Sequence, residues 1–196
     1  MILSFILLFI LFLIWSIYML KGKLNQLDNC FYNKIKITNI KTKIFKMITF
    51  FASAKFVAFL CILLLIFIQN KRIPIVIIMN MLIMWFLIGT LKNIFKRERP
   101  NKNRLVEEKG YSYPSGHTMT ATIFYGFLIF LLMISNLIIP LKISLILFLI
   151  VLILLVGYTR VYLGVHFLSD VIGAFLFGTS YLLLYIFFTY FILRIF

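Results

Sequence analysis

Long apolar stretches separated by shorter polar segments form the main pattern of this chain. An α-helix needs about 17 to 25 mostly apolar residues to cross the hydrocarbon core of a bilayer, and each stretch is of that length. The pattern predicts six such helices, at Met1–Leu20, Ile48–Ile68, Ile73–Leu91, Thr118–Leu137, Ile143–Thr159 and Ser169–Leu193. The expected fold class is therefore an all-α integral membrane protein, a bundle of six transmembrane helices.

The composition agrees with a membrane protein. Hydrophobic residues make up 64% of the 196 residues and the mean hydropathy is +1.11, whereas soluble domains average about 45–50% apolar residues. Met1–Leu20 has neither a basic start nor a small-residue cleavage site, so we expect a first membrane helix and not a signal peptide. No repeat or linker divides the sequence, and one domain over residues 1–196 is expected.

The polar segments are placed so that the chemically interesting ones can meet. In a protein with six spans, the first, third and fifth loops lie on the same membrane face. Here these loops are residues 21–47, 92–117 and 160–168, and the first carries seven lysines. The candidate functional residues lie in the third and fifth loops and at the helix ends beside them, so we expect one active site at one membrane face.

The chain is strongly basic, with 20 Lys and Arg against 5 Asp and Glu and a net charge of +15. In a soluble protein such a charge would suggest nucleic acid. No basic, aromatic-interleaved soluble module is present, so the expected partner is the lipid bilayer and no nucleic-acid partner is expected. Lys55 lies early in the second predicted helix, and we expect it to extend toward the interface.

Three cations and a turn make a candidate phosphate site. Arg99 and Arg160 can hold phosphate oxygens with two parallel hydrogen bonds, and Lys92 adds a point charge. Ser115 and Gly116 open the fourth predicted helix, where backbone N–H groups and the helix dipole favour an anion. Taken alone, the segment around Ser115 is equally well explained as an ordinary helix N-cap.

Both histidines of the chain lie near these residues. His166 and Asp170 are four residues apart and share a face if a helix has begun there. A carboxylate on one ring nitrogen fixes the tautomer and leaves the other nitrogen free to attack, although a purely structural pair is the alternative. Gly164 is expected to turn His166 back toward Arg160, and His117 directly follows Gly116.

The order and spacing of these residues resemble a known signature. The segments Lys92-x6-Arg99-Pro100, Pro114-Ser115-Gly116-His117 and Thr159-Arg160-x5-His166-x3-Asp170 are similar to the three-part motif of the type 2 phosphatidic acid phosphatase (PAP2) superfamily. The one departure is Thr159, where the family usually has Ser, and Thr keeps the hydroxyl. The six predicted helices also resemble the small bacterial membrane lipid phosphatases of this superfamily.

The resemblance implies a role for each residue. His166 would be the nucleophile that forms a phosphohistidine, Asp170 would orient it, and His117 would be the general acid and base. The phosphoryl oxygens would be held by Lys92, Arg99, Ser115, Gly116 and Arg160. The resemblance also implies that no metal and no cofactor are needed, and the sequence has no carboxylate cluster or Cys/His set of the metal-binding kind.

The expected substrate is a membrane lipid phosphate: undecaprenyl diphosphate, phosphatidylglycerophosphate or phosphatidic acid. The site residues bind the phosphate that all three share, so the choice stays open, as does the oligomeric state. A non-catalytic lipid-phosphate binding or transport protein and a lipid-to-lipid phosphotransferase are the alternatives. A haloperoxidase is disfavoured because those enzymes are typically soluble.

The charge pattern and the resemblance disagree about which side of the membrane holds the site. The first, third and fifth loops carry 15 Lys and Arg, and the opposite face has four, Lys71, Arg72, Lys142 and Arg194. Positively charged loops usually stay in the cytoplasm. The resemblance instead implies an extracytoplasmic active site with both termini inside, in a multi-pass protein of the cell membrane, and this is the orientation we expect.

Overall fold

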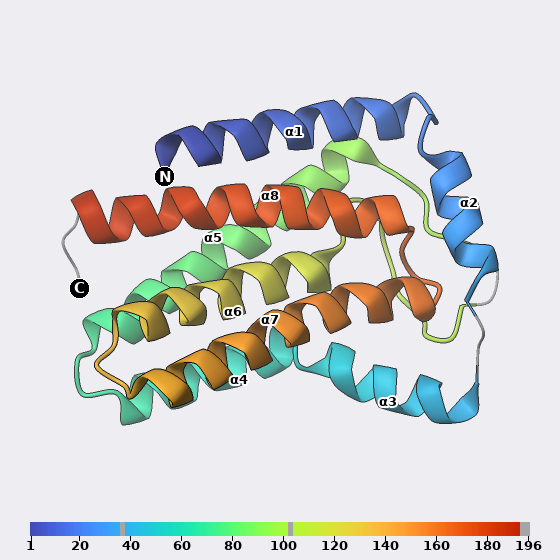
Figure 1. Cartoon of the computed structure of the whole chain (residues 1–196). Coiled ribbons are helices and arrows are strands. Elements are labelled where there is room, and N and C mark those ends of the chain that lie inside the picture. Colours follow the sequence, from blue (N-terminus) through green and yellow to red (C-terminus); the bar gives the residue numbers. More distant parts are fainter. Residues whose placement is uncertain (36–37, 102–103, 193–196) are drawn as a thin grey trace.

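The computed structural model describes residues 1–35, 38–101 and 104–192, and every regular element in these ranges is a helix (Figure 1). The helices are α1 (Ile2–Leu20), α2 (Asn25–Asn33), α3 (Asn39–Phe50), α4 (Ala54–Phe67), α5 (Arg72–Phe95), α6 (Gly116–Ile134), α7 (Ile139–Tyr162), α8 (Leu168–Phe187) and the π-helical turn η1 (Phe188–Ile192). Five are long and apolar enough to cross a membrane, or six if the bent pair α3 and α4 is one span. The predicted fold class is confirmed.

The long helices run side by side, and the connections between them gather at two opposite ends (Figure 1). One end holds α2, residues 104–115 and residues 163–167, and we call it the site end. The other end holds Met1, residues 68–71 and residues 135–138. The first, third and fifth loops therefore lie together, as the sequence predicts for a six-span chain.

Helix α6 forms the centre of the bundle. In its most apolar stretch of 18 residues, 50% is buried, against 17% in the corresponding stretch of α1 and 11% in that of α7. Small residues let α8 approach it closely, since a Cβ atom on Gly126 would lie 2.5 Å from Leu182 and one on Gly178 would lie 3.2 Å from Thr122. Small residues at helix contacts are a common packing device in membranes, where burial of apolar surface gives little driving force between helices.

The second predicted helix, Ile48–Ile68, is wrong as a continuous element. In the structure α3 ends at Phe50 and α4 begins at Ala54, with a bend of 44° between them. Ser53 explains the restart, because its side chain accepts a hydrogen bond of 3.2 Å from the Phe56 amide as an N-cap. Lys55 follows in the first turn of α4 and is exposed.

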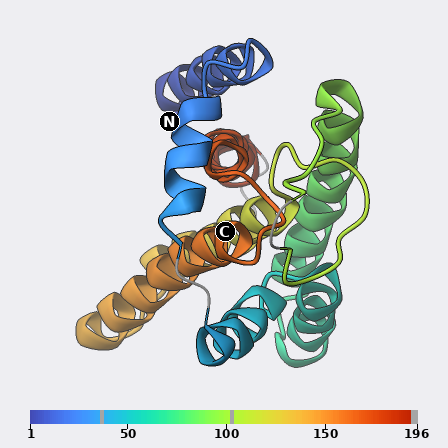
Figure 2. The same cartoon turned by 90° about the vertical axis from the view of Figure 1, so that its right-hand side faces the viewer.

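The first loop, predicted over residues 21–47, is also more ordered than the sequence indicates. It contains α2 and most of α3, and Thr38 caps α3 by accepting from the Lys41 amide. Neither helix has the length of a span by itself. Figure 2 looks onto the site end and shows α2 crossing it beside the start of α8.

The other predicted helices exist with shifted ends. Helix α5 continues past Leu91 to Phe95, which places Lys92 in its last turn. Helix α7 is longer than Ile143–Thr159 and takes Pro140 into its first turn, where a proline loses no hydrogen bond. The predicted end of the last helix at Leu193, like Arg194, lies outside the described residues.

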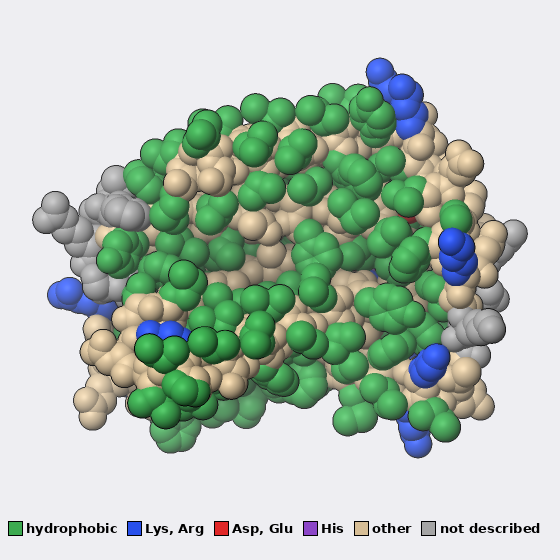
Figure 3. Space-filling model, viewed as in Figure 1, with side chains coloured by type: hydrophobic (Ala, Val, Ile, Leu, Met, Phe, Trp, Pro, Cys, Tyr) green, Lys and Arg blue, Asp and Glu red, His purple; other side chains and the backbone are tan. Residues whose placement is uncertain are grey.

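The surface fits a multi-pass membrane protein. In Figure 3 apolar side chains cover the flank of the bundle, and the Lys and Arg side chains of this face lie toward its two ends. Large apolar residues point outward from the flank, with exposed fractions of 79% for Leu3, 77% for Phe67 and 72% for Phe86. In water such an apolar surface would cause the molecules to associate, whereas lipid tails cover it without a cost in free energy.

Candidate active site

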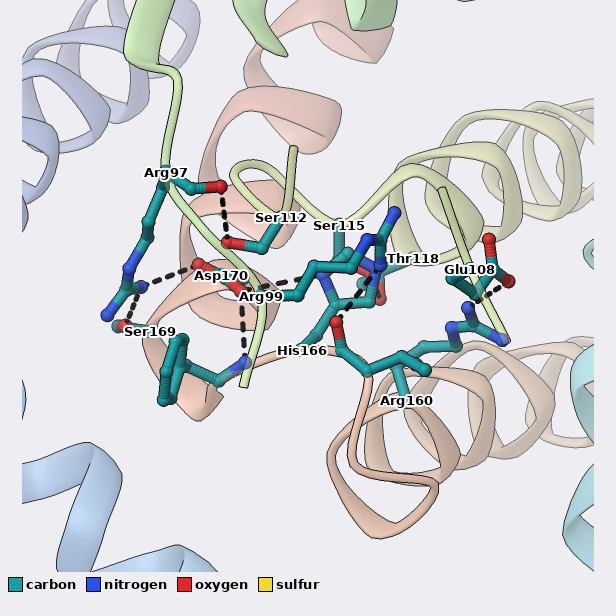
Figure 4. A network of polar contacts seen from close by, with 12 residues as sticks. Arg97, Arg99, Glu108, Ser112, Ser115, Thr118, Arg160, His166, Ser169 and Asp170 are labelled. Atoms are coloured by element: carbon teal, nitrogen blue, oxygen red, sulfur yellow. Dashed lines mark hydrogen bonds and ion pairs between the residues drawn. The ribbon is translucent and has the colours of Figure 1, made fainter. Parts of the chain in front are cut away.

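All eight predicted site residues lie at the site end, on four neighbouring segments. Lys92 is in the last turn of α5 and Arg99 is in the segment after it, while Ser115, Gly116 and His117 start α6. Arg160 is in the last turns of α7, and Asp170 is in the first turn of α8. Figure 4 shows the side chains of Arg99, Arg160, His166 and Asp170 converging between these elements.

A turn between α7 and α8 positions His166. Gly164 adopts a positive φ of 70°, a conformation that glycine takes without steric penalty. The backbone amides of Val165 and His166 then donate to the Arg160 carbonyl, each at 3.3 Å. His166 is thereby turned back beside Arg160, and the residue is only 1% exposed.

Asp170 lies behind the His166 ring. The distance from Asp170 Oδ2 to His166 Nδ1 is 3.4 Å, yet Nδ1 makes no hydrogen bond of acceptable geometry. Oδ2 therefore faces the ring nitrogen as a nearby negative charge. The hydrogen bond that Oδ2 accepts, of 2.9 Å, comes from the Phe167 amide. That bond caps the start of α8 and holds the carboxylate against the ring.

The other ring nitrogen faces Arg99. Arg99 Nη1 lies 3.2 Å from His166 Nε2, so Nε2 accepts and Nδ1 carries the hydrogen toward Asp170. Burial, and then the charges of Arg160, Arg99 and Lys92, lower the pKa of His166 well below its ordinary value. His166 is therefore a neutral imidazole with its Nε2 lone pair directed toward the cations, as a nucleophile requires.

Arg99 also supports the loop around it. Its guanidinium donates to the carbonyl oxygens of Gly110 at 2.9 Å, Lys109 at 3.1 Å and Val165 at 3.0 Å. Its predicted role as a phosphate ligand therefore coincides with a structural one. Of the Arg99 nitrogens, Nη1 faces His166, so it is the one that a group bound at His166 Nε2 would meet.

Arg160 is paired with a residue that the sequence analysis missed. Its Nη2 donates to Glu108 Oε1 at 2.6 Å and its Nη1 to Thr49 Oγ1 at 2.9 Å, while its buried Nε has no partner. Burial raises the pKa of Glu108, but the charges of Arg160, His117 and Arg99 outweigh it, so the pKa lies below its ordinary value. Glu108 is ionised, and an anion already lies beside the predicted phosphate ligands.

The start of α6 lies beside the Lys92 ammonium group. Ser115 is in the N-cap position, but its side chain makes no cap hydrogen bond and pairs with Thr118 Oγ1 at 2.9 Å. A Cβ atom on Gly116 would lie 3.9 Å from Lys92 Nζ, so the ammonium group is close to the helix start. Half-buried His117 follows. The ionisable groups close enough to act on it are those of Arg160, Glu108, His166 and Lys92.

Tyr113, a second residue that the sequence did not indicate, fixes this turn. Its ring is fully buried and stacks on Phe12 with a centroid distance of 6.2 Å. Its hydroxyl lies 2.8 Å from Ser16 Oγ. Gly173 leaves room for the ring, because a Cβ atom there would lie 2.4 Å from the hydroxyl oxygen. The residue before Pro114 is thus held by both α1 and α8.

Arg97 and Asp28 were missed as well. Arg97 Nη1 donates to Asp170 Oδ1 at 2.6 Å, and Arg97 Nη2 donates to Asp28 Oδ2 at 2.8 Å (Figure 4 shows the contact with Asp170). The sequence held one signal for Asp28, which is the only carboxylate before residue 98. Nothing in the pattern connected it to the site, 142 residues away from Asp170 along the chain.

Comparisons with known proteins agree with this geometry. The PAP2 superfamily matches residues 73–193, more than half of the chain. The chain belongs to the PAP2 superfamily. Phosphatidylglycerophosphatase B of Bacillus subtilis (strain 168) is 41% identical over 90 residues, which are 45% of this chain and 44% of that protein. The match therefore spans less than half the length of that relative.

Two solved structures are similar in fold. The transmembrane PAP2 type phosphatidylglycerolphosphate phosphatase from Bacillus subtilis superposes with a TM-score of 0.87 at 25% identity, over 96% of this chain and 97% of that one. Aquifex aeolicus LpxE gives a TM-score of 0.65 at 24% identity, over 82% of this chain and 93% of that one. The first likeness extends the shared fold to the residues before position 73.

Proposed function

We propose that this chain is a membrane lipid phosphate phosphatase that acts through a phosphohistidine on His166. One observation carries the proposal: a buried, neutral imidazole presents Nε2 to Arg99 with a carboxylate behind its other nitrogen. The cations that surround it come from separate elements at one end of an apolar bundle. Membership of the PAP2 superfamily supports the same chemistry.

In the first step, His166 Nε2 attacks the phosphorus atom of the lipid phosphate. A P–N bond forms, the P–O bond to the leaving group breaks, and His117 gives its proton to the leaving oxygen. Asp170 keeps the Nδ1 hydrogen on the far side of the ring and stabilises the positive charge that the ring acquires. Arg99 Nη1 transfers its contact from Nε2 to a phosphoryl oxygen.

In the second step, the now neutral His117 takes a proton from water, and the water oxygen attacks phosphorus. The P–N bond breaks, inorganic phosphate leaves, and His166 recovers its Nε2 lone pair. Lys92, Arg160 and the amides at the start of α6 hold the phosphoryl oxygens through both steps. A lipid alcohol in place of water would give phosphate transfer, which remains the second candidate because the same intermediate serves both.

The place of the site supports a lipid phosphate as the substrate. A lipid can present its headgroup phosphate to the site end while its chains stay beside the apolar flank of the bundle. The name of the Bacillus subtilis relative favours phosphatidylglycerophosphate, and undecaprenyl diphosphate and phosphatidic acid remain candidates. No group of three or more His, Cys, Asp and Glu side chains that could hold a metal occurs among the described residues, and we propose a metal-independent reaction.

Phosphate release tests this proposal. The protein, purified in detergent and treated with EDTA, is offered phosphatidylglycerophosphate, undecaprenyl diphosphate, phosphatidic acid and a soluble phosphate ester. We expect release from at least one lipid at a rate that EDTA does not change, and slower release from the soluble ester. A strict requirement for added metal would overturn the mechanism. Loss of phosphate from the donor lipid only when a lipid alcohol is supplied, with the phosphate recovered on that alcohol, would favour the phosphotransferase.

We also propose that the site end faces the extracytoplasmic side, against the charge pattern. Cys30 offers a test, because it is exposed on α2 at the site end, whereas Cys61 is buried in α4. A membrane-impermeant thiol reagent added to intact cells is expected to label the Cys61→Ser variant and not the Cys30→Ser variant. Labelling of Cys30 only after the cells are permeabilised would place the site in the cytoplasm.

A further inference from the structure

Arg97 connects two buried carboxylates at the site end. Its Nη1 donates to Asp170 Oδ1 and to Ser169 Oγ, each at 2.6 Å. Its Nη2 donates to Asp28 Oδ2 at 2.8 Å. The guanidinium also lies over the Phe167 ring, with its central carbon 4.3 Å from the ring centroid. Its planar group is therefore held on its edges and on one face, an arrangement that lysine could not reproduce.

Asp28 closes the same network from α2. Its Oδ1 accepts from the Ser169 amide at 2.9 Å, and its Oδ2 accepts from Ser169 Oγ at 2.6 Å as well as from Arg97. The side chain is 2% exposed, so these contacts are shielded from solvent. A buried carboxylate is tolerated only with such partners, and Asp28 has its charge and both oxygens satisfied.

The network leaves Asp170 with a single orientation. Arg97 holds Oδ1, while the Phe167 amide holds Oδ2 at 2.9 Å, the oxygen that faces His166 Nδ1. Rotation of the carboxylate would break both contacts. Asp28 in turn prevents Arg97 from swinging away, so a residue of the first loop is linked to the nucleophile through three successive contacts.

Negative and positive groups also lie on opposite sides of the His166 ring. Asp28 and Asp170 carry two negative charges and Arg97 carries one positive charge, so the network is negative overall. It lies behind the His166 ring, and Arg99, Arg160 and Lys92 lie on the phosphate side. As the P–N bond forms, the ring becomes positive, and a negative group behind it stabilises that change.

We propose that Asp28 and Arg97 are positioning residues for the nucleophile, acting on His166 through Asp170. The inference rests on the proposed function, since it gives these residues a purpose in phosphoryl transfer. A purely structural role, in which Asp28 only ties α2 to α8, would also explain their burial. The two roles differ in whether the His166 tautomer and the chemical step respond to the substitutions.

Kinetics provide the first test. For the Asp28→Asn and Arg97→Lys variants we expect kcat to fall about 10- to 100-fold, the size of the loss when a residue that orients a metal-binding side chain is removed. KM should change less than about twofold. Glu98→Gln is the matched control, because Glu98 is adjacent, acidic and exposed, and it should keep wild-type kcat. In an Asp170→Asn background, Asp28→Asn should lower kcat by less than about threefold, since its effect passes through Asp170.

The two histidines allow a second test that needs no turnover. In protein labelled with 15N-histidine, two sets of ring signals are expected, and His117→Ala assigns them. We expect His166 in wild type and in Glu98→Gln to show a protonated Nδ1 and an unprotonated Nε2. In Asp28→Asn and Arg97→Lys the ring should exchange between tautomers, while melting in detergent reports whether the variants remain folded.

The outcomes separate the two proposals. Unchanged kcat in both variants, or unchanged His166 ring signals in folded variants, would overturn the positioning role even if wild type is an active phosphatase. An equal loss from Asp28→Asn with and without Asp170 would do the same. If wild type releases phosphate from no lipid, the proposed function fails, and the ring signals still decide whether Asp28 and Arg97 fix the His166 tautomer.

Discussion

Replacing His166 by alanine is expected to lower phosphate release by at least about 10⁴-fold, because the proposed two-step route begins with attack by its Nε2. Arg99 Nη1 keeps the Val165 carbonyl as an acceptor, so the loop around it should hold its place. The measurement is kcat for the best lipid substrate, together with acid-labile 32P incorporation into the protein. Wild type should carry the label, and the variant should not.

A folded control is essential here, since His166 is almost fully buried. The His166→Asn variant fills part of the space and keeps a polar group, yet it has no ring nitrogen to attack. We expect it to be as inactive as alanine and to melt close to wild type. If either variant, shown to be folded, keeps more than about a tenth of wild-type turnover, the nucleophile has been assigned to the wrong residue.

Arg160 should give the second largest effect. Arg160→Ala removes a buried guanidinium that we propose holds a phosphoryl oxygen in the transition state, and we expect kcat/KM to fall about 10²- to 10³-fold, as when an oxyanion donor is lost. Vanadate, which occupies the place of the phosphoryl group, should inhibit the variant far more weakly than wild type. Arg160→Lys should recover little, because an ammonium group cannot serve Thr49, Glu108 and a phosphate together.

The pairing with Glu108 requires a matched variant. Arg160→Ala leaves an ionised Glu108 without its partner, and that alone could disturb the site. The double variant Arg160→Ala with Glu108→Ala removes the stranded charge. Both variants should be equally impaired if Arg160 binds the phosphate, whereas recovery of activity in the double variant would reduce Arg160 to a partner of Glu108. The exposed Glu107→Gln is the neutral control.

The pKa of His166 bears on the pH at which these measurements are made. Because burial and three neighbouring cations lower this pKa, the ring stays neutral until the pH falls well below 6.5. Protonation of the nucleophile should therefore not limit kcat/KM of the free enzyme near neutral pH. Effects seen between pH 6 and 8 would then report on other groups, and the variants can be compared at pH 7.

Local pattern was sufficient for much of this protein. The length of the apolar stretches predicted the all-α membrane fold, because a bilayer admits few other spanning structures. The alternation of loops between faces predicted that the segments around Arg99, Ser115 and His166 would meet. Gly164 was recognised as a turn, since a glycine between two predicted helices commonly marks one.

The local sequence pattern was less informative where one helix ends and the next begins within a single apolar stretch. The sequence around Ser53 reads as one hydrophobic run, yet the capping hydroxyl and a bend of 44° divide it into α3 and α4. The segment of α2 is polar and short, so its hydrophobic pattern was too weak to predict a helix. Its conformation is stabilised by contacts with the start of α8, which no pattern within the segment records.

What the sequence determined by itself is the class of fold and membership of the PAP2 superfamily, because span length and motif spacing are properties of neighbouring residues. What only the tertiary structure decided is which distant side chains complete the candidate active site. Glu108 beside Arg160, and Asp28 joined through Arg97 to Asp170, come from segments with no shared period or spacing. Burial of charge selects such partners, and burial exists only once the helices have packed.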